Sequence, residues 1–259
     1  MLSSLVAIPI SRNVHLLYQL IRRDFSARFT GSALGLAWAV LQPLSLVVLY
    51  WFVFTFMIPR GPSAGGQYVY FLIAGLIPWI GFNEGIMRST TAIVDNAAVV
   101  RRLAFRSELL VVVPNASAIL FELIGLGLFL IFLIATGSVS RYLWLLPFAV
   151  ACQFAIQVGL GWMLAALYVF FRDLTQILGF VLSIVFYLSP ILYPATGRFE
   201  KFFVWNPLTP LLGLFRSAML GSALPPPASI VFLVVVAVLA FIGGLSFFRR
   251  AQPTIADLI

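Results

Sequence analysis

The sequence predicts an all-α polytopic membrane protein with six transmembrane helices. Only 9% of the 259 residues are charged and 62% are hydrophobic, whereas an ordinary soluble domain is roughly 25% charged. Long uncharged stretches separate the charged residues, and each is long enough for one helix across a hydrocarbon core of about 30 Å. These stretches do not alternate in polarity as the strands of a membrane barrel do. The composition therefore excludes a water-soluble enzyme.

The uncharged stretches define one transmembrane domain over residues 1–259. The expected spans are 34–58, 68–87, 109–136, 143–171, 174–193 and 227–248. Because six is even, both termini lie on the same side of the membrane. Most of the 16 basic residues fall in segments on the side of the termini, and Lys and Arg accumulate on the cytoplasmic side. We therefore expect cytoplasmic termini, and the net charge of +8 reflects topology and not nucleic-acid binding.

Few residues inside the spans are suited to catalysis or proton coupling. The sequence has no G-x-x-x-x-G-K-[ST] motif and no H-E-x-x-H motif, and it has a single cysteine, Cys152, and a single histidine, His15. Only Glu122 is clearly intramembrane, whereas proton-driven transporters usually carry several ionisable residues there. Glu122 is either a functional carboxylate or a structural partner in the bundle. We expect no enzyme activity, no metal site and no cofactor in this chain.

Residues 11–30, SRNVHLLYQLIRRDFSARFT, form the first informative segment outside the spans. Apolar and basic residues recur on opposite sides of a helix with this sequence, which predicts an amphipathic helix in the membrane interface. Arg22, Arg23 and Arg28 cluster before the first span and are suited to attracting an anionic headgroup. The alternative is a basic flank that only orients the first span.

The stretch 88–108, RSTTAIVDNAAVVRRLAFRSE, is the second informative segment, and it predicts a short helix over roughly 97–104. Asp95 or Asn96 can cap it at its start. The helix would present apolar and cationic side chains together, as docking of a soluble partner requires; the alternative is a loop against lipid headgroups. Its members are Val99, Val100, Arg101, Arg102, Leu103, Phe105 and Arg106.

The outer segment 194–226 is too long for a simple turn, and it is apolar where a solvated loop would be polar. Asn206–Pro207 indicates a turn. Thr209, Pro210 and Gly221 then predict the N-cap, the first residue and the terminating glycine of a short helix. Such a helix would dip into the outer leaflet or cover an opening; the alternative is an interfacial anchor.

Aromatic residues make up 15% of the chain. Some belong to the interfacial belts of a membrane protein, but two groups near the outer ends of the first and fifth spans are unusually dense. Aromatic faces suit weak, sliding contact with the C–H surfaces of sugars, although packing is the commoner explanation for any single ring. The two groups comprise Tyr50, Trp51, Phe52, Phe54 and Phe56, and Phe186, Tyr187 and Tyr193.

Four blocks resemble the permease subunits of type-2 ABC exporters of lipid-linked polysaccharide, which include the O-antigen, capsule and teichoic-acid exporters. The blocks are RRDFSARFTGSALGLAW (22–38) with LQPL (41–44), VDNAAVVRRLAFRSELL (94–110), FFRDLTQIL (170–178), and YLSPILYP (187–194) with NPLTPLLGLFRSAMLG (206–221). Their order over nearly the full length is more specific than any one block. One departure is that Arg106 and Ser107 stand between Phe105 and Glu108, where family members often have proline and arginine.

The resemblance implies a complex of two copies of this chain, which form a channel, and two ATP-binding subunits, which bind ATP and Mg²⁺. Residues 95–106 would be the coupling helix, 11–30 the interface helix with Arg22, Arg23 and Arg28 at the substrate entry, and 194–226 the extracytoplasmic re-entrant gate helices. The implied channel aromatics are Tyr50, Trp51, Phe54, Phe186, Tyr187 and Tyr193, and the implied gate residues are Trp205, Asn206, Pro207 and Arg216.

The implied cargo is a lipid-linked polysaccharide that crosses the bacterial inner membrane. Two other functions fit the residues. One is an ABC exporter of drugs or small lipids, which would have the same architecture. The other is an ATP-independent lipid flippase or scramblase, because the scarcity of intramembrane charge argues against proton coupling and not against scrambling.

Overall fold

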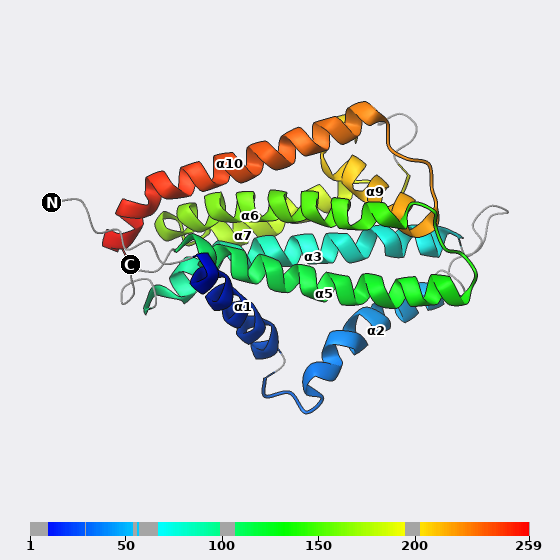
Figure 1. Ribbon diagram of the computed structural model, residues 1–259, viewed down its shortest axis with the longest axis horizontal. Coiled ribbons are helices and arrows are strands. Elements are labelled where there is room, and N and C mark those ends of the chain that lie inside the picture. Colours follow the sequence, from blue (N-terminus) through cyan, green and yellow to red (C-terminus); the bar gives the residue numbers. More distant parts are fainter. Residues whose placement is uncertain are drawn as a thin grey trace.

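The computed structural model describes residues 10–28, 30–53, 56, 67–98, 107–194 and 203–258 (Figure 1). Every regular element among these residues is helical, which confirms the all-α class. The α-helices are α1 (Ile10–Ala27), α2 (Trp38–Phe52), α3 (Gln67–Asp95), α5 (Glu108–Ala135), α6 (Leu146–Phe170), α7 (Leu174–Tyr187), α9 (Leu208–Leu220) and α10 (Pro227–Leu258). Two 3-10 turns, η1 (Gly35–Ala37) and η3 (Leu143–Leu145), precede α2 and α6.

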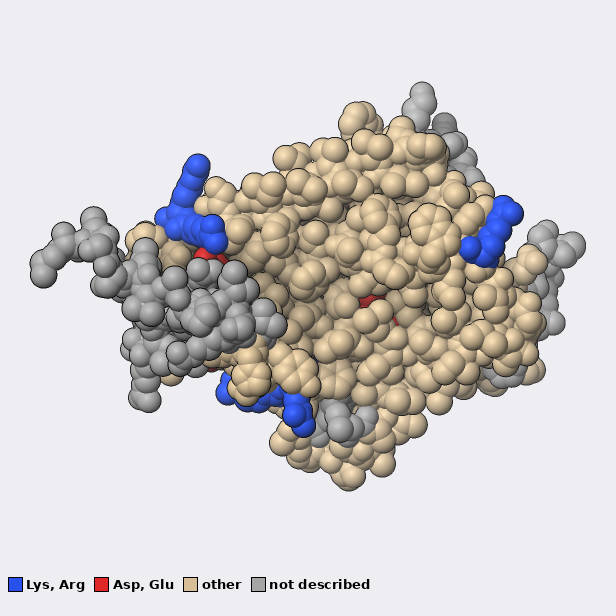
Figure 2. Space-filling model, in the orientation of Figure 1, with Lys and Arg blue, Asp and Glu red and all other residues tan. Residues whose placement is uncertain are grey.

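Four helices are long and apolar enough to cross a membrane: α3, α5, α6 with η3, and α10. Each has at least 25 residues, and 25 residues reach about 37 Å at 1.5 Å per residue. They lie along the long axis of the molecule (Figure 1). In Figure 2, the visible Lys and Arg side chains lie toward the two ends of the face shown, and the surface between them is uncharged apart from a few acidic atoms near the middle. Such a surface suits hydrocarbon.

The helices at the first and fifth predicted spans are shorter. α2 has 15 residues and α7 has 14, so each reaches roughly 21–23 Å, less than a hydrocarbon core of about 30 Å. α7 ends at Tyr187, where the chain turns through Leu188–Ser189–Pro190. The described residues thus contain four helices of spanning length and three shorter apolar ones, α2, α7 and α9, and six complete spans stay a prediction.

Two glycines in the left-handed conformation follow helix ends. Gly137 has a φ of 70° after α5, and Gly221 has a φ of 69° after α9. A left-handed residue lets the amide groups beyond a helix bond back to its last carbonyls, and glycine adopts this conformation without a steric penalty. The Gly221 amide donates to the carbonyl of Ser217. The predicted terminating glycine at Gly221 is therefore confirmed.

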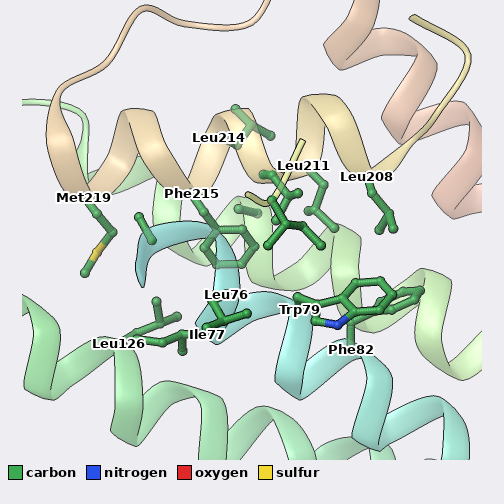
Figure 3. Close-up of a cluster of buried hydrophobic side chains, with 14 of the residues drawn as sticks. Leu76, Ile77, Trp79, Phe82, Leu126, Leu208, Leu211, Leu214, Phe215 and Met219 are labelled. Carbon is green, nitrogen blue, oxygen red and sulfur yellow. The ribbon is translucent and has the colours of Figure 1, made fainter. Parts of the chain in front are cut away.

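The core lies between α3 and the helices around it. Figure 3 shows α9 packed on α3, with one side chain from α5 joining the cluster. This arrangement buries an almost wholly apolar α9 in the protein and not at a solvated surface. The labelled side chains are Leu76, Ile77, Trp79 and Phe82 from α3, Leu126 from α5, and Leu208, Leu211, Leu214, Phe215 and Met219 from α9.

The start of α1 and the end of α10 lie at the same end of the molecule as the end of α3 and the start of α5 (Figure 1). This arrangement agrees with the expectation that both termini share a side. We call this end the terminal end, and the end that carries α9 the α9 end.

The backbones of α6 and α10 meet at two glycines. A Cβ atom added at Gly159 would lie 2.2 Å from the carbonyl oxygen of Ala240, and one at Gly244 would lie 2.0 Å from that of Gly159. Small residues allow this close approach between membrane helices, where van der Waals packing replaces the hydrophobic drive available in water.

We predict that Gly159→Val destabilises the chain by about 1–3 kcal/mol or more, because the added side chain meets a rigid backbone. Thermal unfolding of the purified full chain in a fixed detergent measures this effect. Gly127→Val is the matched control, since a Cβ there meets no atom within 4 Å. Equal unfolding temperatures for the two variants would contradict the close α6–α10 contact.

Candidate functional site

Four charged side chains join α1 to α3 at the terminal end. Arg28 pairs with Glu84, Arg88 Nη2 lies 2.7 Å from Asp24 Oδ1, and Arg88 Nη1 lies 3.6 Å from Glu84 Oε1. All four are partly buried, so water screens them less than it screens surface pairs. Burial lowers the pKa of Arg28, and the charge of Glu84 opposes that effect. We call Asp24, Arg28, Glu84 and Arg88 the ionic cluster.

Sequence reasoning missed the ionic cluster, although a signal for it exists. Asp24 and Arg28 are four residues apart, and so are Glu84 and Arg88. Each pair therefore lies on one face of its own segment if that segment is helical. When two such pairs lie on neighbouring segments, the arginine of each can pair with the carboxylate of the other. The structure shows this arrangement in the ion pairs Arg28–Glu84 and Arg88–Asp24.

The three arginines predicted at the substrate entry lie in different surroundings. Arg22 lines an apolar groove of about 890 Å³ between α1, α5 and α6. Arg23 lines a separate cavity of about 290 Å³ together with Asp24, Arg88 and Asp95. Arg28 belongs to the ionic cluster, and its guanidinium also lies 4.8 Å from the ring centroid of Phe121. The predicted headgroup role of these arginines stays a prediction.

The structure describes only the edges of the predicted coupling segment. Asp95 is the last residue of α3, and the Asn96 side chain donates to the carbonyl of Ala92 at 2.8 Å. Asn96 thus bonds back to α3. The other predicted members lie outside the described residues, and these are Val99, Val100, Arg101, Arg102, Leu103 and Phe105.

The chain after this segment is fastened to the bundle at the first residue of α5. Glu108 Oε1 accepts from Arg249 of α10 at 3.2 Å, and the Glu108 carbonyl accepts from the indole N–H of Trp162 in α6 at 2.9 Å. A displacement of the predicted coupling segment would therefore be transmitted to α3 on one side and to α5, α6 and α10 on the other.

The predicted channel aromatics are divided between packed and exposed positions. Tyr50 packs against the core from α2, and the Phe186 ring centroid lies 5.5 Å from that of Trp79. Tyr187 is 63% exposed, and its carbonyl accepts from the Tyr193 hydroxyl. The Trp51 side chain and Phe54 lie outside the described residues.

α2 and α7 present broad exposed apolar faces. Only Leu178 and Leu182 are buried in α7, and its exposed residues recur at helical spacing along one side. Exposed apolar faces of this size mark contact with lipid or with another protein. The exposed apolar residues include Ile177, Phe180, Val181, Ile184 and Tyr187 in α7, and Trp38, Leu41, Leu44, Val48 and Phe52 in α2.

Asn206 joins the start of α9 to the turn after α7. Its Oδ1 accepts from the Leu208 amide at 2.9 Å, and its Nδ2 donates to the Ser189 hydroxyl at 2.9 Å. The predicted N-cap at Thr209 and first helical residue at Pro210 are wrong, because α9 begins two residues before Pro210, at Leu208. Asn206 satisfies the free amide at this helix start instead, through an Asx turn.

Arg216 fastens α9 to α3 and to the same turn. Its Nε donates to the Phe71 carbonyl at 3.2 Å and its Nη2 to the Ile191 carbonyl at 3.0 Å, while the guanidinium lies 3.5 Å from the Phe71 ring centroid. Gly75 provides the space, since a Cβ there would lie 2.5 Å from Nη2. Arg216 is 6% exposed, whereas Trp205, also a predicted gate residue, is 78% exposed.

Glu122 joins α5 to α6 and α3. Its Oε2 accepts from Gln153 Nε2 at 2.5 Å, and the same nitrogen lies 3.3 Å from the Pro78 carbonyl oxygen. A Cβ at Gly81 would lie 2.2 Å from Oε2, so the carboxylate occupies space that the glycine leaves open. These contacts favour the structural alternative for Glu122.

We predict that Arg216→Leu lowers the unfolding temperature and loosens α9. The buried Ile191 carbonyl loses its donor, which costs about 1–3 kcal/mol when the carbonyl is left unpaired, and the partly buried hydrogen bond to the Phe71 carbonyl is lost as well. Thermal unfolding and hydrogen exchange over 208–220 in the purified chain measure the two effects. Arg141→Leu is the control, because Arg141 is exposed and contacts its neighbour Tyr142. If both variants behave alike, Arg216 does not fasten α9.

Comparison with known proteins identifies relatives that cover up to 94% of the chain. Residues 15–220 match the family described as ABC-2 type transporter. The O-antigen export system permease protein RfbA of Myxococcus xanthus is 27% identical over 94% of this chain and 95% of its own length. A Klebsiella pneumoniae protein of the same name is 26% identical with the same coverage, and the Escherichia coli polysialic acid transport protein KpsM is 22% identical over 90% and 92%. The chain belongs to the ABC-2 type transporter family.

Proposed function

We propose that this chain is the channel-forming permease subunit of an ATP-driven exporter that moves lipid-linked, O-antigen-like polysaccharide across the bacterial inner membrane. The observation that carries the proposal is the similarity to O-antigen export permeases over 94% of the chain. The similarity extends across the interface helix, the bundle and α9, and is therefore not confined to one shared motif.

Two copies of the chain form the channel in this proposal. α2 and α7 support it, because each leaves a broad apolar face uncovered by the rest of its own chain. Pairing of such faces between two copies would bury them and enclose a path between the copies. The exposed Tyr187 at the end of α7 would offer an aromatic surface to the passing sugars, and we propose the same role for Trp51 and Phe54.

Energy comes from a separate ATP-binding subunit that docks at residues 95–106 on the cytoplasmic side. The hydrogen bond of Asn96 to α3 and the bonds of Glu108 to α6 and α10 support this step, because a push on the segment reaches the bundle at both edges. The ionic cluster extends the same movement to α1. ATP and Mg²⁺ are bound by the partner in this proposal.

The cargo enters from the inner leaflet beside α1 and leaves beside α9. Arg22 and Arg23 are exposed on α1 and are suited to attract a pyrophosphate headgroup. At the other end, Asn206 and Arg216 hold α9 and the turn after α7 together, so that opening of this gate moves both as a unit. This assignment agrees with cytoplasmic chain termini.

We predict that Leu103→Asp, within the coupling segment, abolishes stable docking of the ATP-binding subunit. A charge placed in an apolar contact has to be desolvated, at a cost of several kcal/mol that reduces affinity at least tenfold. Co-purification of the subunit with the full chain, and export of lipid-linked polysaccharide in cells, are the measurements.

Ser138→Asp is the control, because Ser138 is an exposed residue at the α9 end of the bundle. It should leave docking and export unchanged. Undiminished docking of the Leu103→Asp chain would show that this segment does not hold the partner. If the unchanged chain binds the ATP-binding subunit but exports small amphiphiles and no polysaccharide, the result would favour a drug or small-lipid exporter.

A further inference from the structure

An apolar groove lies between α1, α5 and α6. It has a volume of about 890 Å³, within the range of about 300–1,000 Å³ that is typical of ligand sites. Arg22 is its only charged lining residue, and the others are apolar or aromatic. The walls are Tyr18, Ile21 and Phe25 from α1, Ala116, Ile119, Leu120 and Leu123 from α5, and Leu146, Pro147, Val150, Ala151 and Phe154 from α6.

The groove is elongated along the bundle. Its α5 wall extends from Ala116 to Leu123, about 10 Å of helix, and its α6 wall from Leu146 to Phe154, about 12 Å. α6 begins at the end of the bundle opposite α1 (Figure 1). The groove therefore starts under α1 and continues across the depth of the bundle, parallel to the direction of lipid chains in a bilayer.

An extended hydrocarbon chain is the occupant that fits these walls. Water gains too few hydrogen bonds in an apolar groove to fill it, and an empty groove loses dispersion contacts on one side. α5 and α6 are helices of membrane-spanning length, so the hydrocarbon next to them is lipid. An acyl chain in the groove would contact α1, α5 and α6 at once.

The charge at the end of the groove selects the headgroup. Arg22 belongs to the amphipathic α1, whose exposed face also carries Arg23. The interfacial position expected for such a helix sets Arg22 at headgroup depth. A guanidinium there attracts a lipid that carries net negative charge more strongly than a zwitterionic one.

The groove is separate from the proposed channel between the two copies, and it shares only Arg22 with the proposed cargo entry. None of its lining residues belongs to α2 or α7, the helices whose exposed faces are proposed to meet between copies. A lipid in the groove would consequently stay in place while cargo passes elsewhere, and Arg23, which lines a different cavity, would remain available to the cargo headgroup.

We propose that the groove between α1, α5 and α6 is a binding site for a resident anionic phospholipid, with one acyl chain along α5 and α6 and the phosphate on Arg22. The lipid fills the space between α1 and the helices α5 and α6. It thereby supports α1 on one side, while the ionic cluster holds α1 to α3 on the other. The site rests on the membrane location of the chain and not on polysaccharide as the cargo.

The test uses the full chain in vesicles of equal parts phosphatidylglycerol and phosphatidylethanolamine, followed by extraction and native mass spectrometry of the lipids that stay bound. We expect phosphatidylglycerol to be enriched about fivefold, the effect of one basic residue at a membrane surface. Arg22→Gln should remove the enrichment. Ala151→Trp should remove retention of both lipids, because the exposed Ala151 lines the groove and a tryptophan there fills it.

Two matched controls separate the site from general effects. Arg23→Gln removes the neighbouring charge outside the groove, and Val238→Trp adds a tryptophan on the exposed face of α10; both should retain lipid as the unchanged chain does. Added phosphatidylglycerol should also raise the unfolding temperature of the unchanged chain more than that of Ala151→Trp.

Three outcomes would overturn the proposal. They are equal retention of the two lipids by the unchanged chain, undiminished retention by Ala151→Trp, and loss of the two-copy state in Ala151→Trp with no loss of lipid, which would make the groove a contact between copies. Loss of polysaccharide export with normal lipid retention would count against the proposed function alone.

Discussion

The bundle depends on the close contact of α3 with α5 and α6, where glycines of α3 leave room for polar side chains. A Cβ at Gly85 would lie 2.6 Å from Gln157 Nε2 and 2.7 Å from Asn115 Oδ1. Gln157 in turn donates to the Gly81 carbonyl at 2.8 Å. In a bilayer these polar groups have no water to bond. Gln157 therefore bonds across helices and fixes the register of α3 against α6, whereas Asn115 Nδ2 donates to the Val111 carbonyl of its own helix α5 at 2.9 Å.

A fixed α3 explains how the two ends of the molecule are connected. At the terminal end it carries Glu84 and Arg88, which hold α1, and it leads into the predicted coupling segment. At the α9 end its Phe71 carbonyl and ring hold Arg216, which positions α9 and the turn after α7. A movement of α3 therefore changes α1 and α9 together, and the exposed α2 and α7 have few buried contacts that oppose it.

The helical class and the positions of the long helices follow from the sequence, because a charged residue in hydrocarbon is costly and uncharged stretches reveal spans. The ends of the short helices do not follow from hydropathy. α7, for example, stops at the turn through Ser189 and Pro190 although the sequence there stays apolar. The ionic cluster joins residues 56 and 64 positions apart, and Arg216 reaches Phe71 across 145 positions. Hydropathy carries no information on such distant pairs. The sequence shows which charged residues are present but not which of them meet in the fold.

The central claim is that this chain provides the path and a separate ATPase provides the energy. The most direct measurement is transport of lipid-linked O-antigen polysaccharide across vesicles that contain the purified chain, with the ATP-binding subunit added or omitted. We expect transport only when the subunit and hydrolysable ATP are both present, and none with the chain alone. Transport by the chain alone, unchanged by the subunit and ATP, would contradict the claim and indicate a scramblase.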